Sequence, residues 1–431
     1  MNPLAVALIV FMVLMFLGMP IVFVMTFSSL IYCLVIGKID LLMVVIEKMF
    51  RGMDSFVLLA IPMFIMCGEV MNRGGITSAI VSFADLMVGR VKGGLAYVNT
   101  LASTFFAGIT GSALSDIASI GSILIPAMEE QGYTKDFSCA VTAATAIQGP
   151  LIPPSIPAVL VASATGLSTG ALFWGGAMPG LLIGIGSAIV IFIKGFFVKL
   201  PKRTVRIPFR EAINVTLHSI LPLMTVVIIL VGMNSGIFTP TEAAAIALAY
   251  ALCITSFIYK PIPFSEFITI CKNVLLQTTT IYLIIAGATT FSYVLATENI
   301  PTKISMLISS HVTSKLGILM VINLILLVWG MFMDTAPSIL VLVPILFPVA
   351  KAAGVNSIHF GVLVITNLMV GMLTPPFGMA IYTTQSVGKC RMGNLIKQLL
   401  PFIVVDLVIL GILTIFPSVS LFLPQLFGFV S

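Results

Sequence analysis

Two proline pairs interrupt apolar segments of this 431-residue chain at corresponding places. One segment reads GPLIPPSI over residues 149–156, and the other reads GMLTPPFG over residues 371–378. Because proline lacks a backbone N–H and clashes with the preceding turn, each pair is expected to break a helix and free several carbonyl oxygens. Such carbonyls, with Ser or Thr hydroxyls, suit a hard cation such as sodium. An ordinary helix kink is the alternative for either pair.

A polar break in a second apolar segment accompanies each proline pair. Segments 93–128 and 315–350 are interrupted at 108–112 and 334–337, and we interpret both as helical hairpins that enter and leave on one side. Two straight spans are the alternative. We expect each hairpin tip to face the proline break of its own half. The predicted sodium ligands are Gly111, Ser112, Ser115, Gly149, Ile152, Pro153, Asp334, Thr335, Ser338, Gly371, Thr374 and Pro375.

Asp334 and Asp116 are the main acidic residues of the two hairpins. An ionisable group at membrane depth costs free energy and marks a functional hypothesis. Asp334 lies at the break, where its carboxylate could coordinate a cation or cap the following half-helix. Asp116 lies one turn into its helix, where capping or interhelical hydrogen bonding are alternatives.

The composition shows that these elements fold in a bilayer. Hydrophobic residues make up 59% of the chain, charged residues only 8%, and the mean hydropathy is +1.19. A soluble domain needs charged residues to cover its exterior. A spanning helix takes roughly 20 apolar residues, which leaves room for about ten spans. We interpret the apolar N-terminus as a retained helix, because no basic region or cleavage site precedes or follows it.

The remaining chemistry-bearing residues predict little beyond structure. The six cysteines lie in apolar runs without CxxC spacing, so we expect buried free thiols. The three histidines show no metal-ligand spacing, so no metal other than sodium is expected. The net charge of +6 is spread through loops, which concerns membrane orientation and does not indicate a nucleic-acid partner.

An internal repeat organises the chain. An ungapped alignment of residues 126–154 with 348–376 gives six identities. Roughly two would arise by chance at ordinary composition. Five of the six are Gly or Pro, the residues that dictate backbone geometry. The two copies cover about 1–198 and 211–424. Repeats of this kind are common in transporters, where the binding site lies between the halves. The identical pairs are Pro126/Pro348, Gly132/Gly354, Gly149/Gly371, Leu151/Leu373, Pro153/Pro375 and Pro154/Pro376.

Each copy is expected to contain the same elements in the same order. Two helices, an amphipathic arm, a third helix and a second arm precede the hairpin and the Pro-broken helix. In the first copy these five elements span 3–18, 19–37, 40–51, 54–72 and 76–90, and in the second 213–235, 240–259, 264–273, 276–296 and 300–311. We expect the four amphipathic stretches among them to be separate helices along the membrane interface.

The predicted organisation has five parts. They are scaffold and arm helices at 1–92, a transport domain at 93–198, a basic cytoplasmic linker at 199–210, a second scaffold at 211–314 and a second transport domain at 315–431. If the first hairpin opens to the cytoplasm and the second to the outside, 15 of the 21 basic residues lie on the cytoplasmic side. This bias supports the orientation and inverts the second copy relative to the first.

The hairpins, broken helices and arms together resemble a known family. The phrases GYTKDFSCAVTAATAIQGPLIPPS and MDTAPSILVLVPILFPVAKAAG, with FGVLVITNLMVGMLTPPFG, resemble the large membrane (M) subunit of tripartite ATP-independent periplasmic (TRAP) transporters over essentially the whole chain. The resemblance is to the sialic-acid branch. It implies an all-α polytopic membrane protein with two inverted repeats and an ion-transporter-like elevator fold.

The resemblance also implies function and partners. We expect sodium-coupled import of an organic acid, either a sialic acid or a C4-dicarboxylate, across the bacterial inner membrane. The implied partners are a small four-helix membrane subunit (Q) and a periplasmic substrate-binding protein (P). Transferring the family's ion sites gives the Ser112 and Asp334 tips with their proline breaks. The predicted substrate-binding residues are Ser112, Ser155, Asn367 and Thr374.

Three other classes compete with this interpretation. A stand-alone sodium/anion symporter of the related fold would share hairpins and breaks, and only dependence on a binding protein separates the two. A channel would need a continuous polar helix face, which the charges do not form. An intramembrane protease would need acids in GxGD or a GxSG serine with a histidine. Neither Asp116 nor Asp334 lies in GxGD, so we predict no enzymatic activity.

Overall fold

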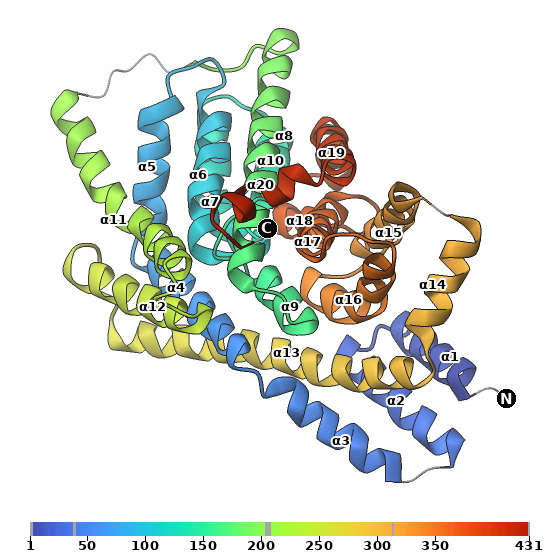
Figure 1. The fold of residues 1–431 in the computed structure, drawn as a ribbon. Coiled ribbons are helices and arrows are strands. Elements are labelled where there is room, and N and C mark those ends of the chain that lie inside the picture. The colour runs from blue at the N-terminus through green and yellow to red at the C-terminus, as the bar shows by residue number, and fades with distance from the viewer. Residues whose placement is uncertain (1–2, 38–39, 203–207, 313, 430–431) are drawn as a thin grey trace.

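The computed structural model describes residues 3–37, 40–202, 208–312 and 314–429 (Figure 1). It is 82% helical, and these residues contain no strand. Of the predicted linker 199–210, residues 203–207 lie outside the described ranges, and helix α11 already begins at Phe209. The fold is therefore all-α, as the sequence predicts.

The helices follow the predicted order in both halves. The first half contains α1 (Pro3–Phe16), α2 (Ile21–Ile36), α3 (Asp40–Met53), η1 (Phe56–Leu59), α4 (Ala60–Arg73), α5 (Ile76–Val88), α6 (Gly94–Thr110), α7 (Ala113–Glu130), α8 (Lys135–Ala146), α9 (Ile156–Thr165) and α10 (Thr169–Phe197). The second half contains α11 (Phe209–Asn234), α12 (Pro240–Phe257), α13 (Phe264–Thr297), α14 (Ile300–His311), α15 (Lys315–Gly330), α16 (Thr335–Ala352), α17 (Ser357–Leu373), α18 (Met379–Gly388), α19 (Met392–Ile415) and α20 (Ser418–Leu426).

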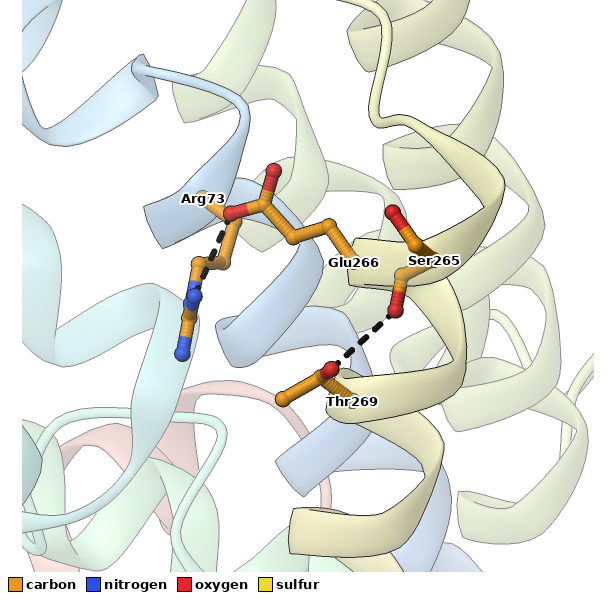
Figure 2. A network of polar contacts seen from close by, with 4 residues as sticks. All are labelled: Arg73, Ser265, Glu266 and Thr269. Carbon is orange, nitrogen blue, oxygen red and sulfur yellow. Dashed lines mark hydrogen bonds and ion pairs between the residues drawn. The ribbon is translucent and has the colours of Figure 1, made fainter.

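The scaffold is built from both halves of the chain. Helix α2 of the first half packs against α13 of the second, while α12 of the second packs against α4 of the first. Helix α13 runs along one side of the molecule with α3 beside it (Figure 1). Figure 2 shows the Arg73 guanidinium at the end of α4 pairing with the Glu266 carboxylate near the start of α13, at 3.2 Å. The repeat thus produces one interlocked frame.

The arm predicted at 264–273 is wrong as a separate helix. It continues without a break into the segment predicted at 276–296, forming the 34-residue α13. No glycine or proline lies at the expected junction, so nothing interrupts the hydrogen bonds there. At 1.5 Å per residue α13 is about 51 Å long, which exceeds the roughly 30 Å hydrocarbon thickness. The other three arms are separate helices, α3, α5 and α14.

Both hairpins and both broken helices are present. Gly111 ends α6 in the left-handed region at φ 59°, and Ser112 already begins the turn into α7, so the chain reverses within two residues. Helices α6 and α7 pack together, as do α15 and α16. The proline pairs lie between α8 and α9 and between α17 and α18, each with a cis peptide between its two prolines. The predicted helical hairpins and breaks are thus present, and their entry and exit on one side of the membrane stays a prediction.

The two halves also exchange elements around the hairpins. Helix α9, which follows the first proline pair, packs against α16 of the second hairpin. Helix α18, which follows the second pair, packs against α7 of the first hairpin. Each hairpin is thus held between the two broken helices, and the tips are positioned by both repeats at once.

Seven helices among the described residues are long and apolar enough to cross a membrane. Other apolar helices, including α9, α15 and α17, are shorter because hairpins and breaks divide the apolar segments. The expectation of six buried cysteines is wrong in part. Cys253 is exposed and Cys271 is half-buried, whereas the remaining four are buried, and all six are free thiols. A thiol on a lipid-facing surface remains in apolar surroundings, so placing it outside the protein core costs little free energy.

We predict that Gly371→Ala destabilises the protein. A Cβ at this position would lie 2.9 Å from the Gly330 Cα, where α17 packs against α15. Because the obstacle is backbone, no side chain can rotate away to make room. Overpacking of this kind costs about 1–3 kcal/mol. Thermal unfolding in detergent should show a lowered midpoint. Gly411→Ala in α19 is the matched control, since its Cβ would meet nothing within 4 Å. Equal midpoints for the two variants would contradict the close helix crossing.

Candidate functional site

A cavity of about 540 Å³ lies between the scaffold and the hairpin tips. Scaffold helices α4 and α13 form one wall, through residues such as Gly68 and Ile281. The opposite wall comes from the α6–α7 tip, the start of α9, the start of α16 and the α17 residues Met369 and Met372. This volume lies within the usual range for small-molecule sites, about 300–1,000 Å³. The cavity therefore joins elements from both repeats.

The first hairpin tip lies directly against the first proline break. A Cβ on Gly111 would be 2.4 Å from the Pro154 carbonyl oxygen, so only glycine permits this approach. A Cβ on Gly149 would be 3.4 Å from the Ser112 carbonyl oxygen. The Ser112 hydroxyl accepts a hydrogen bond from the Ser115 backbone N–H at 3.4 Å and so caps α7. The expected contact between tip and break is thus present.

The second tip has the same arrangement with an acid at the cap. The Asp334 Oδ1 accepts a hydrogen bond from the Thr335 backbone N–H at 2.7 Å, which caps α16. The Ser338 hydroxyl donates to the Asp334 carbonyl oxygen at 2.6 Å. The Thr335 hydroxyl donates to the Met372 sulfur at 3.0 Å, which ties the tip to α17 just before the second break. Of the two roles expected for Asp334, capping is observed directly.

The proline breaks leave carbonyl oxygens without helical partners. In the first break, no hydrogen bond from the described residues reaches five of the carbonyls, and the same holds for four in the second. A buried carbonyl without a partner costs free energy unless a cation or water satisfies it. These oxygens are the donor set that sodium prefers. They belong to Gly149, Leu151, Ile152, Pro153 and Pro154, and to Thr374, Pro375, Pro376 and Phe377.

Three half-helices begin at the cavity. The first residues of α7, α9 and α16, including Ala113, Ile156 and Thr335, all line it. A helix N-terminus carries unpaired N–H groups and about half a positive charge from the macrodipole. Three of them converging on one cavity favour an anionic group there. No lysine, arginine or histidine lies among the described lining residues.

The predicted ion ligands divide into two groups. Gly111, Ser112, Ser115, Asp334 and Thr335 line the cavity itself. The others lie behind the tips, outside the lining: Gly149, Ile152, Pro153, Ser338, Gly371, Thr374 and Pro375. The sequence thus located both the tips and the breaks, and the assignment of sodium to them stays a prediction.

Only one of the four predicted substrate residues, Ser112, lines the cavity. The Ser155 hydroxyl donates to the Pro150 carbonyl oxygen and accepts from the Ala158 N–H, so it caps α9. The Asn367 amide donates to the Asn323 side chain and carbonyl, each at 3.0 Å. The Thr374 hydroxyl donates to the carbonyl oxygen of its own helix. Ser155 and Thr374 thus hold nearby backbone, whereas Asn367 joins α17 to α15, and a substrate role for these three residues stays a prediction.

The sequence interpretation missed the scaffold wall. Glu69 and Asn72 of α4, with Gln277 and Thr280 of α13, line the cavity opposite the tips. Glu69 is an acid within an 18-residue apolar stretch, which is a signal that would have identified it. The QTTT run that begins at Gln277 is a second such signal. Asp116, by contrast, is fully buried and does not line the cavity. The N-terminus of its helix, α7, is capped by Ser112 and not by Asp116.

Comparison with known proteins shows the family of this chain. The family model of the tripartite ATP-independent periplasmic transporter, DctM component, matches residues 8–419. The chain belongs to this family. It is 38% identical over 417 residues to the sialic acid TRAP transporter large permease protein SiaM of Vibrio cholerae, with 96% of each chain covered. The protein is therefore a multi-pass TRAP large permease, as its sequence motifs indicated.

Two further relatives extend this result. The C4-dicarboxylate TRAP transporter large permease protein DctM of Pseudomonas aeruginosa is 39% identical over 385 residues, with 88% of this chain and 89% of that protein covered. The crystal structure of the Alcanivorax borkumensis YdaH transporter matches with a TM-score of 0.57 at 15% identity, covering 91% of this TRAP permease and 90% of that chain. At this identity, the likeness shows the fold alone.

We predict that the cavity admits water-soluble reagents. In a variant without the six native cysteines, Ser115→Cys should react with a small charged methanethiosulfonate, because Ser115 lines the cavity. Ser338→Cys is the matched control, since Ser338 lies fully buried one turn inside α16 and should be protected. Labelling is measured by mass spectrometry in detergent and in proteoliposomes. Equal labelling of both sites would contradict the described cavity.

Proposed function

We propose that this TRAP permease imports an organic acid, of the sialic acid or C4-dicarboxylate class, driven by a sodium gradient. The observation that carries the proposal is the cavity between the two hairpin tips, where three half-helix N-termini meet without a basic side chain. An anionic group bound there would be stabilised by dipoles and by nearby cations instead of by lysine or arginine. The names of the two relatives support the substrate classes.

Sodium suits the two tip–break contacts on chemical grounds. Each contact combines carbonyls that accept no hydrogen bond from the described residues with Ser or Thr groups at the tip. In the second, the Asp334 carboxylate supplies a charge that offsets the ion. Because each bound sodium would place positive charge close to the cavity, ion and anion binding would favour one another.

The packing of the helices into two groups supports an elevator movement, which we propose for this permease. The cross-packed helices α2, α4, α12 and α13 form the frame, while the hairpins and broken helices form a compact unit against it. The cavity lies between these bodies, so a sliding movement of the hairpin unit would carry a bound solute with it. The proposed route is across the bacterial inner membrane.

We propose two protein partners, one that captures the solute and one that supports the frame. The family name describes a tripartite, periplasmic system. A periplasmic binding protein (P) would deliver the organic acid to the cavity, and a small four-helix membrane subunit (Q) would support the frame. We propose that transport depends on both.

The role of Asp334 gives a direct test of ion coupling. Asp334→Asn keeps the cap on α16, because asparagine accepts the same Thr335 hydrogen bond, yet it removes the charge that offsets sodium. We expect a strongly raised sodium half-saturation in transport, with thermal stability nearly unchanged. Uptake at graded sodium concentrations, with purified protein in liposomes, measures both the affinity and the maximal rate.

Asp334→Ala separates capping from coupling. Loss of an N-cap costs about 1 kcal/mol of stability, so this variant should lower the unfolding midpoint as well as the sodium response. If Asp334→Asn has normal rates and a normal sodium half-saturation, Asp334 acts only as a cap and does not belong to the ion site.

A cross-link tests the elevator movement. A Cβ on Gly68 would lie 3.5 Å from the Thr110 Cβ, joining scaffold helix α4 to the first hairpin tip. Disulfides need a Cβ separation of about 3.5–4.5 Å, so the pair Gly68→Cys with Thr110→Cys should oxidise readily in a cysteine-free variant. Transport should stop on oxidation and return after reduction, because the tip could no longer move past α4.

The control pair lies within the frame. Gly74→Cys with Thr255→Cys joins α4 to α12, where a Cβ on Gly74 would lie 2.4 Å from the Thr255 methyl carbon. Oxidation of this pair should leave transport active. Undiminished transport with the Gly68–Thr110 bridge fully formed would overturn the elevator proposal.

A further inference from the structure

The two walls of the cavity differ in chemistry. On the hairpin side lie the half-helix N-termini and the hydroxyls of Ser112, Ser115 and Ser119. These groups favour an anion. On the scaffold side lie Glu69 and Asn72 of α4, with Gln277 and Thr280 of α13. The Asp334 carboxylate also lies on the hairpin side, where it accepts a hydrogen bond from the Thr335 N–H and would be offset by the proposed sodium. A solute that spans the cavity therefore meets helix N-termini and hydroxyls at one end and the Glu69 carboxylate at the other.

Glu69 is not neutralised by the residues around it. Its carboxylate forms no hydrogen bond or ion pair with the described residues. Arg73 lies one turn further along the same helix, but its guanidinium pairs with Glu266 of α13 instead (Figure 2). Gly68 holds this part of α4 against the Thr110 backbone, where a Cβ would be 3.3 Å from the Thr110 Cα. The close packing of Gly68 therefore places the α4 backbone at Glu69 beside the first tip, and the Glu69 carboxylate lines the cavity without a partner among the described residues.

The neighbouring scaffold groups are neutral and hydrogen-bonding. The Asn72 Oδ1 accepts from the Thr77 hydroxyl at 2.9 Å, which leaves the amide N–H groups of Asn72 to donate. Gln277 and Thr280 are both exposed on the cavity face of α13. Together with Glu69 they offer acceptors and donors for hydroxyl or amide groups. A second carboxylate at this wall would face Glu69 without a basic residue to compensate.

We propose that Glu69 selects the substrate of this permease: it accepts a hydrogen bond from a hydroxyl or amide of a hydroxylated monocarboxylic acid and repels the second carboxylate of a dicarboxylate. The inference rests on the proposed function, because it assumes that an organic acid occupies the cavity. The acid's single carboxylate lies at the half-helix N-termini, and its hydroxylated end lies at the scaffold wall. The cavity volume of about 540 Å³ accommodates a solute larger than a four-carbon acid.

Binding to two defined probes tests the proposal. N-acetylneuraminate carries one carboxylate with several hydroxyls, and succinate carries two carboxylates without hydroxyls. Dissociation constants for both are measured at saturating sodium with the full chain in lipid nanodiscs. The wild type should prefer N-acetylneuraminate. Glu69→Gln should bind succinate more tightly and N-acetylneuraminate more weakly, so that the preference falls by about tenfold or more.

Two other variants complete the experiment. Glu130→Gln removes an exposed acid at the end of α7, outside the cavity, and should leave the preference unchanged. Glu69→Asp retains the charge and should retain much of the discrimination against succinate. If Glu69→Gln folds poorly, the wild-type preference and the preference of Glu69→Asp still test the role of the Glu69 charge.

The outcomes separate this inference from the proposed function. If the wild type binds neither probe nor transports any organic acid, both fail together. If it binds succinate as tightly as N-acetylneuraminate, or if Glu69→Gln leaves the preference unchanged, the selective role of Glu69 fails while the transport function stands. A reduced preference in Glu69→Gln, with an unchanged preference in Glu130→Gln, supports the inference.

Discussion

The structure depends on one constraint: a backbone carbonyl cannot remain unpaired in hydrocarbon. Each proline pair frees such carbonyls within an apolar segment, so each break is expected to lie against protein, water or a cation. The chain places a hairpin tip against each break, with glycines at 111 and 149 allowing the close approach in the first half, but the described residues donate no hydrogen bond to these carbonyls, which leaves them for a cation or water. The same arrangement creates a set of oxygen ligands suited to sodium. The proposed ion sites are thus a consequence of how the breaks are satisfied.

The exchange of elements between the halves extends this effect to the substrate. Because α9 packs on α16 and α18 packs on α7, neither hairpin tip is set by its own repeat alone. The crossing brings the N-termini of α7, α9 and α16 to one cavity. An organic anion held there would lie near both ion sites, which gives a physical route for coupling between ion and solute. The long α13 closes the opposite side and supplies half of the scaffold wall.

Local backbone rules explain how much the sequence predicted. Proline, glycine and capping residues act within a few positions, so the breaks, the Gly111–Ser112 turn and the Asp334 cap were all identifiable. The continuous α13 was missed because an amphipathic stretch followed by an apolar one suggested two helices, although nothing between them stops a helix. Glu69 and Gln277 meet the tips only through packing between distant segments, which a single sequence does not specify. The hydroxyls of Ser155 and Thr374 bond to nearby backbone carbonyls, as short polar side chains often do, and the sequence pattern does not show this.

Sodium-driven uptake that depends on partners is the most direct test of the account. The chain is reconstituted in liposomes with an inward sodium gradient, and the candidate binding protein and small membrane subunit are added singly and together. The account predicts uptake of the organic acid only when both partners and the sodium gradient are present. Robust uptake by this chain alone, or uptake that is indifferent to sodium, would contradict it, and the former would favour a stand-alone symporter.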